Sequence, residues 1–237
     1  MPLVFAVPAC RVKAGHRSAA PPGLPWDRKG VDVYARSTTV LARPEAIDAG
    51  IAYIRDEVMP TLLGMSGCIG LSMLVDRPSG RCIVTSAWQT EDTMHASEEE
   101  LRPLRDRAAE TLGGGPLVEE WEIAVLHRDH ASTPAACVRA TWVRISPEHA
   151  DRIVDIYRTT LLPQIREFEG FCSASFMVNR STGYAVSSVT FDSGDAMRGT
   201  RNLAAVVREQ GARSASAEVV EVGEYELALA HLRVPSW

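Results

Sequence analysis

Apolar and polar residues alternate over residues 33–41, which predicts a β-strand with one buried face. In the next segment, apolar residues recur every three or four positions from Ile47 to Leu62, the spacing of an amphipathic helix. Pro44 suits the first turn of this helix, because the amide hydrogen that proline lacks would have no partner there. Pro60 lies late in the same segment, so we expect a kink or the end of the helix there.

The residues that follow predict two strands, a second helix and a last strand. The two strands run from Gly67 to Trp88, with a turn at residues 77–80 between them. A helix is expected from about Asp92 until the glycines at 113–115 end it, and the last strand covers residues 117–127. This order, β-α-β-β-α-β, is that of the ferredoxin-like fold.

The turn at residues 77–80 sets the expected register of its hairpin. If Asp76 faces Arg81, then Ile69 faces Trp88, and the two side chains share one face of the sheet. In the last strand, strict alternation would put four residues on one face: Trp121, Ile123, Val125 and His127. These pairings predict which residues of the hairpin and of the last strand lie together.

The same pattern occurs twice in the chain. A shift of 103 residues aligns about sixty positions without a gap and matches, among others, Arg36 with Arg139, Thr38 with Thr141, Pro60 with Pro163 and Gly67 with Gly170, and near the end of each half the shift becomes 104. We therefore predict two tandem units, at residues 31–127 and 136–237, joined by a polar linker at 128–135. Residues 1–30, which contain several glycines and prolines, are predicted to form a flexible leader.

Composition narrows the class of protein. Of the 237 residues, 46% are hydrophobic and 23% are charged, which is typical of a globular protein. A net charge of −5 disfavours a nucleic-acid partner, because such proteins need a clustered basic surface. No apolar run is long enough to predict a membrane span, and the chain lacks the basic start of a secretory signal, so we expect a cytoplasmic protein.

The cysteines do not indicate a metal site. Five are present, at positions 10, 68, 82, 137 and 172, and their spacing matches no zinc motif. The expected hairpin register places Cys68 and Cys82 several residue pairs apart, too far for a disulfide. Buried thiols in a reducing compartment are the better interpretation.

Several short motifs, in this order and spacing, resemble the antibiotic biosynthesis monooxygenase (ABM) family. They are Pro60 before Gly67, the sequence Leu-Val-Asp-Arg-Pro-Ser-Gly-Arg at 74–81, and Ser-Ala-Trp-Gln-Thr-Glu-Asp-Thr-Met at 86–94. The second half resembles the family less, since Phe191 takes the place of Trp88. The resemblance implies an α+β fold in which the two ferredoxin-like units pack sheet to sheet as an intramolecular dimeric α/β barrel, and it leaves further homo-oligomers open.

The resemblance also implies a range of functions. The family includes oxygenases that oxidise anthrone-like polyketides without a cofactor, and haem-degrading enzymes. The first group needs an apolar pocket, a hydrogen-bonding partner for the substrate enolate, and exclusion of water. Haem degradation is disfavoured, because Ser97 and Thr200 stand where the family's ligand histidine is expected, and Thr39 and Trp142 stand where its asparagine is expected.

We therefore expect a small hydrophobic or aromatic substrate and no cofactor or metal. The alternative is a barrel of the same fold that binds a small ligand or assembles with partners without catalysis. The candidate pocket residues are Trp88, Arg36, Thr38, Ser86 and His127 in the first half, and Arg139, Thr141 and His231 in the second.

Each of these candidates also has a structural interpretation. Trp88 would be a core residue, each arginine would be paired with an acid, and each histidine would lie solvated at a strand end. None of them is assigned a catalytic role. We further expect the first half to keep the pocket, because Trp142 and Tyr157 would fill the corresponding space in the second half.

Overall fold

The computed structural model describes residues 33–232, so the predicted leader lies outside the described residues. The first half contains β1 (Val33–Leu41), a 3-10 turn (Pro44–Ala46), α1 (Ile47–Tyr53), a π-helical turn (Ile54–Val58), α2 (Met59–Gly64), β2 (Cys68–Asp76), β3 (Arg81–Trp88), α3 (Glu91–Ala96), α4 (Glu98–Leu112) and β4 (Leu117–Arg128). The second half repeats this order with β5 (Cys137–Arg144), a 3-10 turn (Pro147–His149), α5 (Ala150–Ile156), a π-helical turn (Tyr157–Leu161), α6 (Leu162–Ile165), β6 (Phe171–Asn179), β7 (Tyr184–Phe191), α7 (Gly194–Gly199), α8 (Arg201–Ala215) and β8 (Glu218–Leu232).

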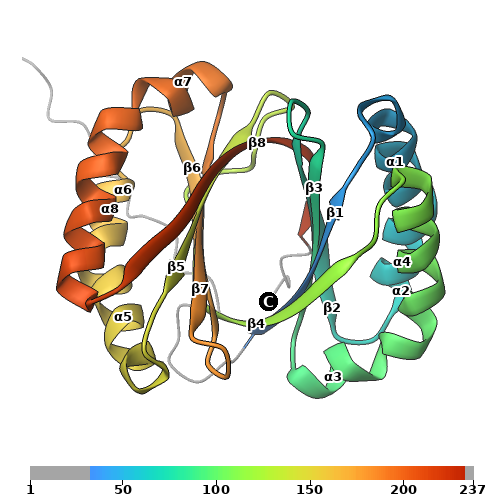
Figure 1. Cartoon of the computed structure of the whole chain (residues 1–237), viewed down its shortest axis with the longest axis horizontal. Coiled ribbons are helices and arrows are strands. Elements are labelled where there is room, and N and C mark those ends of the chain that lie inside the picture. Colours follow the sequence, from blue (N-terminus) through green and yellow to red (C-terminus); the bar gives the residue numbers. More distant parts are fainter. Residues whose placement is uncertain (1–32, 233–237) are drawn as a thin grey trace, which may run out of the picture.

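The eight strands form one closed antiparallel barrel in the order β1-β3-β2-β8-β5-β7-β6-β4. Figure 1 shows the barrel in the centre, with α1, α2 and α4 on one outer side and α5, α6 and α8 on the opposite side. The α+β class and the barrel are therefore confirmed. Closure leaves no open sheet edge, which is the usual hazard of a small antiparallel sheet.

The two longest strands close the barrel. Residues 117–123 of β4 pair with β1 in their own half, and residues 122–128 pair with β6 of the other half. In the same way, β8 pairs with β5 over residues 218–226 and with β2 over residues 226–232. The two sheets are thus joined edge to edge by shared strands in addition to facing each other, which the sequence pattern did not predict.

The first helix of each half continues through its late proline instead of ending there. A π-helical turn precedes Pro60, and within it the amide of Met59 donates to the carbonyl of Ile54, five residues earlier. The amide of Leu162 donates to Tyr157 in the same way before Pro163. The wider turn accommodates a ring that would otherwise strike the carbonyl of the preceding turn. The expected kink therefore takes the form of a π turn.

Two registers differ from expectation. The hairpin pairs Asp76 with Arg81 as predicted, but a shift between Cys68 and Gly70 places Cys68, and not Ile69, opposite Trp88. In β4, a shift between Ile123 and Val125 breaks the alternation at the point where the strand changes partners. Trp121 consequently lies in the barrel interior, whereas Val125 belongs to the core beneath the helices of the second half. The predicted single face for Trp121 and Val125 was wrong.

Three apolar cores result from this arrangement. One lies between the first sheet and α1, α2 and α4, and includes Trp88; a second lies between the other sheet and α5, α6 and α8, and includes Phe191. Trp88 and Phe191 are both completely buried. The third core lies inside the barrel and contains Trp121 and Tyr225.

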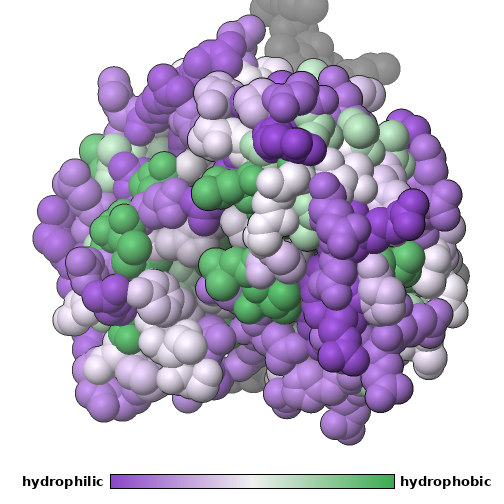
Figure 2. Space-filling view, turned by 45° about the vertical axis from the view of Figure 1, so that its right-hand side comes forward, coloured by the Kyte–Doolittle hydropathy of each residue, from purple (hydrophilic) through white to green (hydrophobic). Residues whose placement is uncertain are grey.

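On the face shown in Figure 2, hydrophilic residues predominate and hydrophobic side chains gather in separate small groups. None of the helices within residues 33–232 is both long and apolar enough to cross a membrane.

Candidate functional site

Each half contains a cavity between its sheet and its helices. The first cavity has a volume of about 60 Å³, and Arg36, Thr38 and Ser86 contribute its polar wall atoms from the sheet. The second cavity offers about 80 Å³, and there the polar residues of the sheet are Arg139, Thr141 and Ser187. The remaining walls are largely apolar in both. Residues of the two π-helical turns line them: Ile54 and Val58 in the first cavity, Tyr157 and Leu161 in the second.

The expectation that only the first half keeps a pocket was wrong, because the second cavity is slightly the larger. Trp142 does not fill it. Its ring lies edge-on to Tyr225 at 6.2 Å between centroids, beneath the guanidinium of Arg81, in the barrel interior. Tyr157 does line the second cavity, but it lies flat against Phe176, with 4.5 Å between the ring centroids. Tyr157 therefore forms a wall and leaves the space beside it open.

The hydroxyl of Tyr157 is held in place by the sheet. It lies 3.0 Å from Ser187 Oγ, within hydrogen-bonding distance. Burial raises the pKa of Tyr157 to about 12, although the hydrogen bond to Ser187 opposes the shift. At neutral pH the phenol is therefore protonated and can donate a hydrogen bond.

Arg36 forms the polar end of the first cavity. Only 5% exposed, it donates to Glu120 Oε1 on β4 from Nε (3.1 Å) and Nη2 (2.8 Å), and to Ser97 Oγ from Nη1 (3.2 Å). Glu98 and His95 complete the cluster: Glu98 lies 3.2 Å from Arg36, and His95 lies 3.0 Å from Glu120. Burial alone would raise the pKa of Glu120, but the hydrogen bonds from Arg36 and His95 lower it overall. The arginine is thus paired with acids, as its structural interpretation predicted.

Arg139 occupies the matching place in the second cavity. It donates to Glu224 Oε1 from Nε (3.1 Å) and Nη2 (2.9 Å), to Thr200 Oγ1 from Nη1 (3.0 Å), and to the carbonyl of Met197 from Nη2 (2.5 Å). Its guanidinium carbon lies 5.4 Å from the centre of the Phe191 ring. The hydrogen bond from Arg201, and also that from Arg139, lowers the pKa of Glu224 despite its burial. Both arginines therefore tie the first strand, the last strand and the second helical segment of their half together.

The other candidates lie away from the cavities. Trp88 is a core residue whose indole nitrogen donates to Ser86 Oγ at 3.0 Å, and it lines neither cavity. His127 stacks against Phe171 and lies 2.7 Å from Asp129, and His231 is exposed opposite Leu71 on β2. The structure thus brings together Arg36, Thr38 and Ser86 in one cavity and Arg139 and Thr141 in the other.

A third cavity, of about 160 Å³, lies inside the barrel, and sequence reasoning missed it. Small residues of both sheets line it, among them Gly70, Ala87, Ser173, Ser175 and Ser188. The sequence does contain a feature that indicates this cavity, because small residues such as Gly70 and Ser72 occupy alternate positions of the second strand. Only the closed barrel shows that these rows face one another and leave space.

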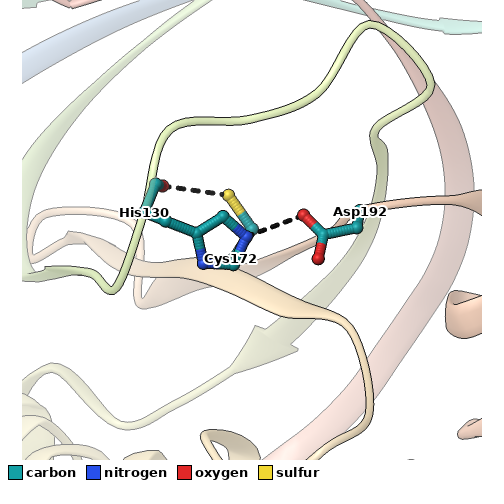
Figure 3. A group of neighbouring side chains, drawn as sticks. All are labelled: His130, Cys172 and Asp192. Atoms are coloured by element: carbon teal, nitrogen blue, oxygen red, sulfur yellow. Dashed lines mark hydrogen bonds and ion pairs between the residues drawn. The ribbon is translucent and has the colours of Figure 1, made fainter.

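One further cluster combines side chains that could serve as metal ligands. Figure 3 shows His130, Cys172 and Asp192 converging from three segments. Their potential ligand atoms all lie within 4.8 Å of one another. Hydrogen bonding already engages its members: His130 Nε2 lies 2.7 Å from Asp192, and the Cys172 thiol donates to the carbonyl of His130 at 3.2 Å. Burial raises the pKa of the Cys172 thiol, which disfavours the thiolate that a metal requires. The cluster is explained as a clasp between the β4–β5 connection and the ends of β6 and β7.

Comparison with known proteins places the chain in a family. No protein-family model matches it. The uncharacterized protein Rv2557 of Mycobacterium tuberculosis is 56% identical over 208 residues, which cover 88% of this chain and 93% of the relative. Rv2558 of the same organism is 52% identical over 222 residues, covering 93% and 94% of the two chains. The chain belongs to the Rv2557/Rv2558 family.

Solved structures show what fold this family has. A candidate monooxygenase from Lactobacillus acidophilus superposes with a TM-score of 0.64 at 8% identity, covering 85% of this chain and 97% of its own. An anthrone oxidase-like protein gives a TM-score of 0.63 at 12% identity, covering 86% and 94%. A ferredoxin-fold protein related to antibiotic biosynthesis monooxygenases, from Listeria monocytogenes, gives 0.50 at 10% identity, covering 83% and 95%. The resemblance of the Rv2557/Rv2558 family to ABM proteins is confirmed at the level of the fold.

Proposed function

We propose that the protein is an ABM-like small-molecule oxygenase that oxidises an aromatic or polyketide-type substrate in its sheet–helix cavities without a cofactor. The observation that carries the proposal is an apolar cavity with arginine and hydroxyl groups at the sheet, present in each half of a fold shared with an anthrone oxidase-like protein. In this proposal, residues 31–127 and 136–237 are tandem ferredoxin-like units that build an intramolecular version of the dimeric barrel.

The proposed reaction converts a methylene group that lies between two aromatic rings or carbonyl groups into a ketone. Loss of one methylene proton leaves an enolate or phenolate, whose electrons reduce O₂ directly and form a carbon–oxygen bond. The resulting peroxide then loses water as the second methylene hydrogen leaves. One oxygen atom enters the substrate, the other leaves in water with both hydrogens, and no external reductant is needed.

The side chains of the second cavity suit the anionic intermediate of such a reaction. The buried guanidinium of Arg139 places positive charge beside the cavity, and its four hydrogen bonds hold it in place. Thr141 and Ser187 add hydroxyl groups that can bond to a substrate oxygen. A positive charge fixed in a site that excludes water stabilises an enolate more strongly than the same charge in solution. These residues bind and orient the substrate, and none is assigned as the base.

Oxygen consumption tests the proposal. Protein treated with a chelator and shown by its absorption spectrum to lack flavin and haem is incubated with anthrone and a panel of polyphenols, in air and under nitrogen. We expect oxygen uptake above the background reaction, and with ¹⁸O₂ one labelled atom in the ketone and the other in water. Absence of enzyme-dependent uptake across the panel, or uptake that disappears with chelation, contradicts cofactor-free oxidation.

Matched variants locate the activity. Thr141→Val removes a hydroxyl from the second cavity and keeps the shape of the side chain, and Thr38→Val does the same in the first. The variant that slows turnover identifies the cavity in use, and Thr85→Val, which lies in the barrel interior, serves as the control.

A second candidate function is ligand binding without catalysis. It is favoured by the engagement of both buried arginines with carboxylates of the protein, which leaves few of their N–H groups for a substrate. Saturable binding of panel compounds without oxygen uptake would support this function instead.

A further inference from the structure

The two cavities differ in their walls. Four aromatic side chains line the second cavity: Tyr157, Phe168, Phe176 and Phe191. The first cavity has none, and aliphatic residues such as Ile54 and Leu112 take their place. Aromatic walls favour flat aromatic ligands, because rings pack face to face or edge to face with an attraction beyond simple burial. The second cavity is therefore the better site for an aromatic molecule.

The cavities also differ in their charge. Arg105 on α4 lines the first cavity, and it is held by Glu98 Oε1 at 2.6 Å and Oε2 at 3.2 Å. The 103-residue shift places Arg208 on α8 at the same point of the second cavity, but it places Arg201 where Glu98 would be needed. Arg201 turns instead to Glu224. Among the described residues, no hydrogen bond or ion pair reaches the half-buried Arg208.

The surroundings leave this charge uncompensated. Around the second cavity Glu224 pairs with Arg139 and Arg201, which leaves Arg208 without a carboxylate. Around the first cavity two arginines meet two carboxylates. A half-buried guanidinium with no internal partner is well placed to bind an external carboxylate, since its planar N–H groups match the two oxygens. Arg208 lies on the helix that covers the aromatic walls. One ligand can therefore place its ring against these walls and its carboxylate on Arg208.

We propose that the second cavity binds an aromatic carboxylate, with the ring between the aromatic walls and the carboxylate paired with Arg208. The first cavity, which has neither feature, does not bind such a ligand. The inference deepens the proposed function by giving the second cavity a ligand class. Oxidation of such a ligand rests on the proposed function, whereas its binding does not. Binding is measured without oxygen, so a failure of either proposal can be recognised separately.

The test compares 2-naphthoate with 2-naphthamide, which has nearly the same shape and no charge, by fluorescence titration under nitrogen. The wild-type protein is expected to bind the acid at least tenfold more tightly than the amide. Arg208→Gln removes the charge at the cavity, and it should weaken binding of the acid about tenfold while leaving the amide within twofold. Arg213→Gln, on the solvent side of the same helix, is the matched control and should change neither.

Three results would overturn the assignment: equal affinity of the wild-type protein for acid and amide, no measurable binding of the acid, or undiminished binding of the acid by Arg208→Gln. The circular dichroism spectrum and urea midpoint of each variant confirm that it is folded; Arg208 is not part of the ion-pair network, so the substitution should leave both unchanged. Because 2-naphthoate has no methylene group to oxidise, this titration tests the binding site alone, and the proposed oxidation is tested separately by the oxygen-uptake experiment.

Discussion

The carboxylate of Glu224 is the most informative position for testing what holds the second half together. It accepts hydrogen bonds from Nε (3.1 Å) and Nη2 (2.9 Å) of Arg139 and from Nε (3.0 Å) of Arg201. Arg139 is 5% exposed and the Glu224 side chain 23% exposed, so water cannot readily replace the lost contacts. Glu224→Gln keeps the shape of the side chain and removes its charge, which leaves the guanidinium of Arg139 buried without a counter-ion.

The expected cost follows from this burial. Removing one partner of a buried ion pair destabilises a protein by about 3–5 kcal/mol. Arg139 keeps its bonds to Thr200 and Met197, and glutamine retains one acceptor oxygen, so we place the loss near the lower limit, at about 3 kcal/mol. With a urea dependence of about 3 kcal/mol per molar, the unfolding midpoint should fall by about 1 M.

Urea unfolding followed by far-ultraviolet circular dichroism measures this shift, provided that the slope of the transition is the same in both proteins. Glu209→Gln is the control, because Glu209 makes an exposed pair with Arg213 at 3.6 Å on the same half of the molecule. Such a helical surface pair contributes only about 0.3 kcal/mol. If Glu224→Gln lowers the midpoint no more than Glu209→Gln does, the buried network does not stabilise the fold and the reasoning fails.

Three further predictions concern pH, packing and thiol chemistry. The hydrogen bonds from Arg201 and Arg139 lower the folded-state pKa of Glu224. The stabilisation that Glu224 contributes is therefore present above its unfolded-state pKa and is lost as the pH falls through its folded-state pKa. Urea midpoints measured between pH 5 and 3 should fall less in Glu224→Gln than in the wild type, and parallel curves would contradict this. Trp88→Ala should cost about 3–5 kcal/mol in urea unfolding, whereas Trp88→Phe, which copies Phe191, should cost less and leave ligand binding unchanged, because Trp88 lines neither sheet–helix cavity. Burial raises the pKa of Cys82 to about 11, so iodoacetamide should label the partly exposed Cys137 of the native protein well before Cys82; mass spectrometry of timed samples checks the order, and the reverse order would refute it.

The sequence by itself determined the elements and their order. Strand β1 occupies Val33–Leu41 as its alternation predicted, and the fourth strand ends at Arg128, one residue beyond the predicted end. The hairpin register near its turn was also predictable, since Asp76 faces Arg81. These features depend on neighbours close in the chain, and side-chain periodicity reports local backbone geometry directly.

Tertiary structure alone decided how the two halves join. The break in alternation between Ile123 and Val125 occurs where β4 leaves β1 and pairs with β6, a strand from the other half of the chain. The residues near position 124 do not predict this change of partner, because the strand that causes it, β6, lies about fifty residues further along the chain. The same distance hides the direction of Trp142, whose neighbours inside the barrel are Arg81 and Tyr225.

The candidate site also has features that the sequence predicted and features that only the folded structure shows. Repetition in the sequence singled out Arg36 and Arg139 as matching positions, and both line cavities. The relative size of the cavities was not predictable, since Tyr157 adds bulk yet lies flat against Phe176 and leaves space beside it. Free volume and the pairing of charges depend on how side chains from distant segments pack together. Composition lists the arginines and the acids, but only the folded chain shows that Arg105 meets Glu98 whereas Arg208 lacks such a partner among the described residues.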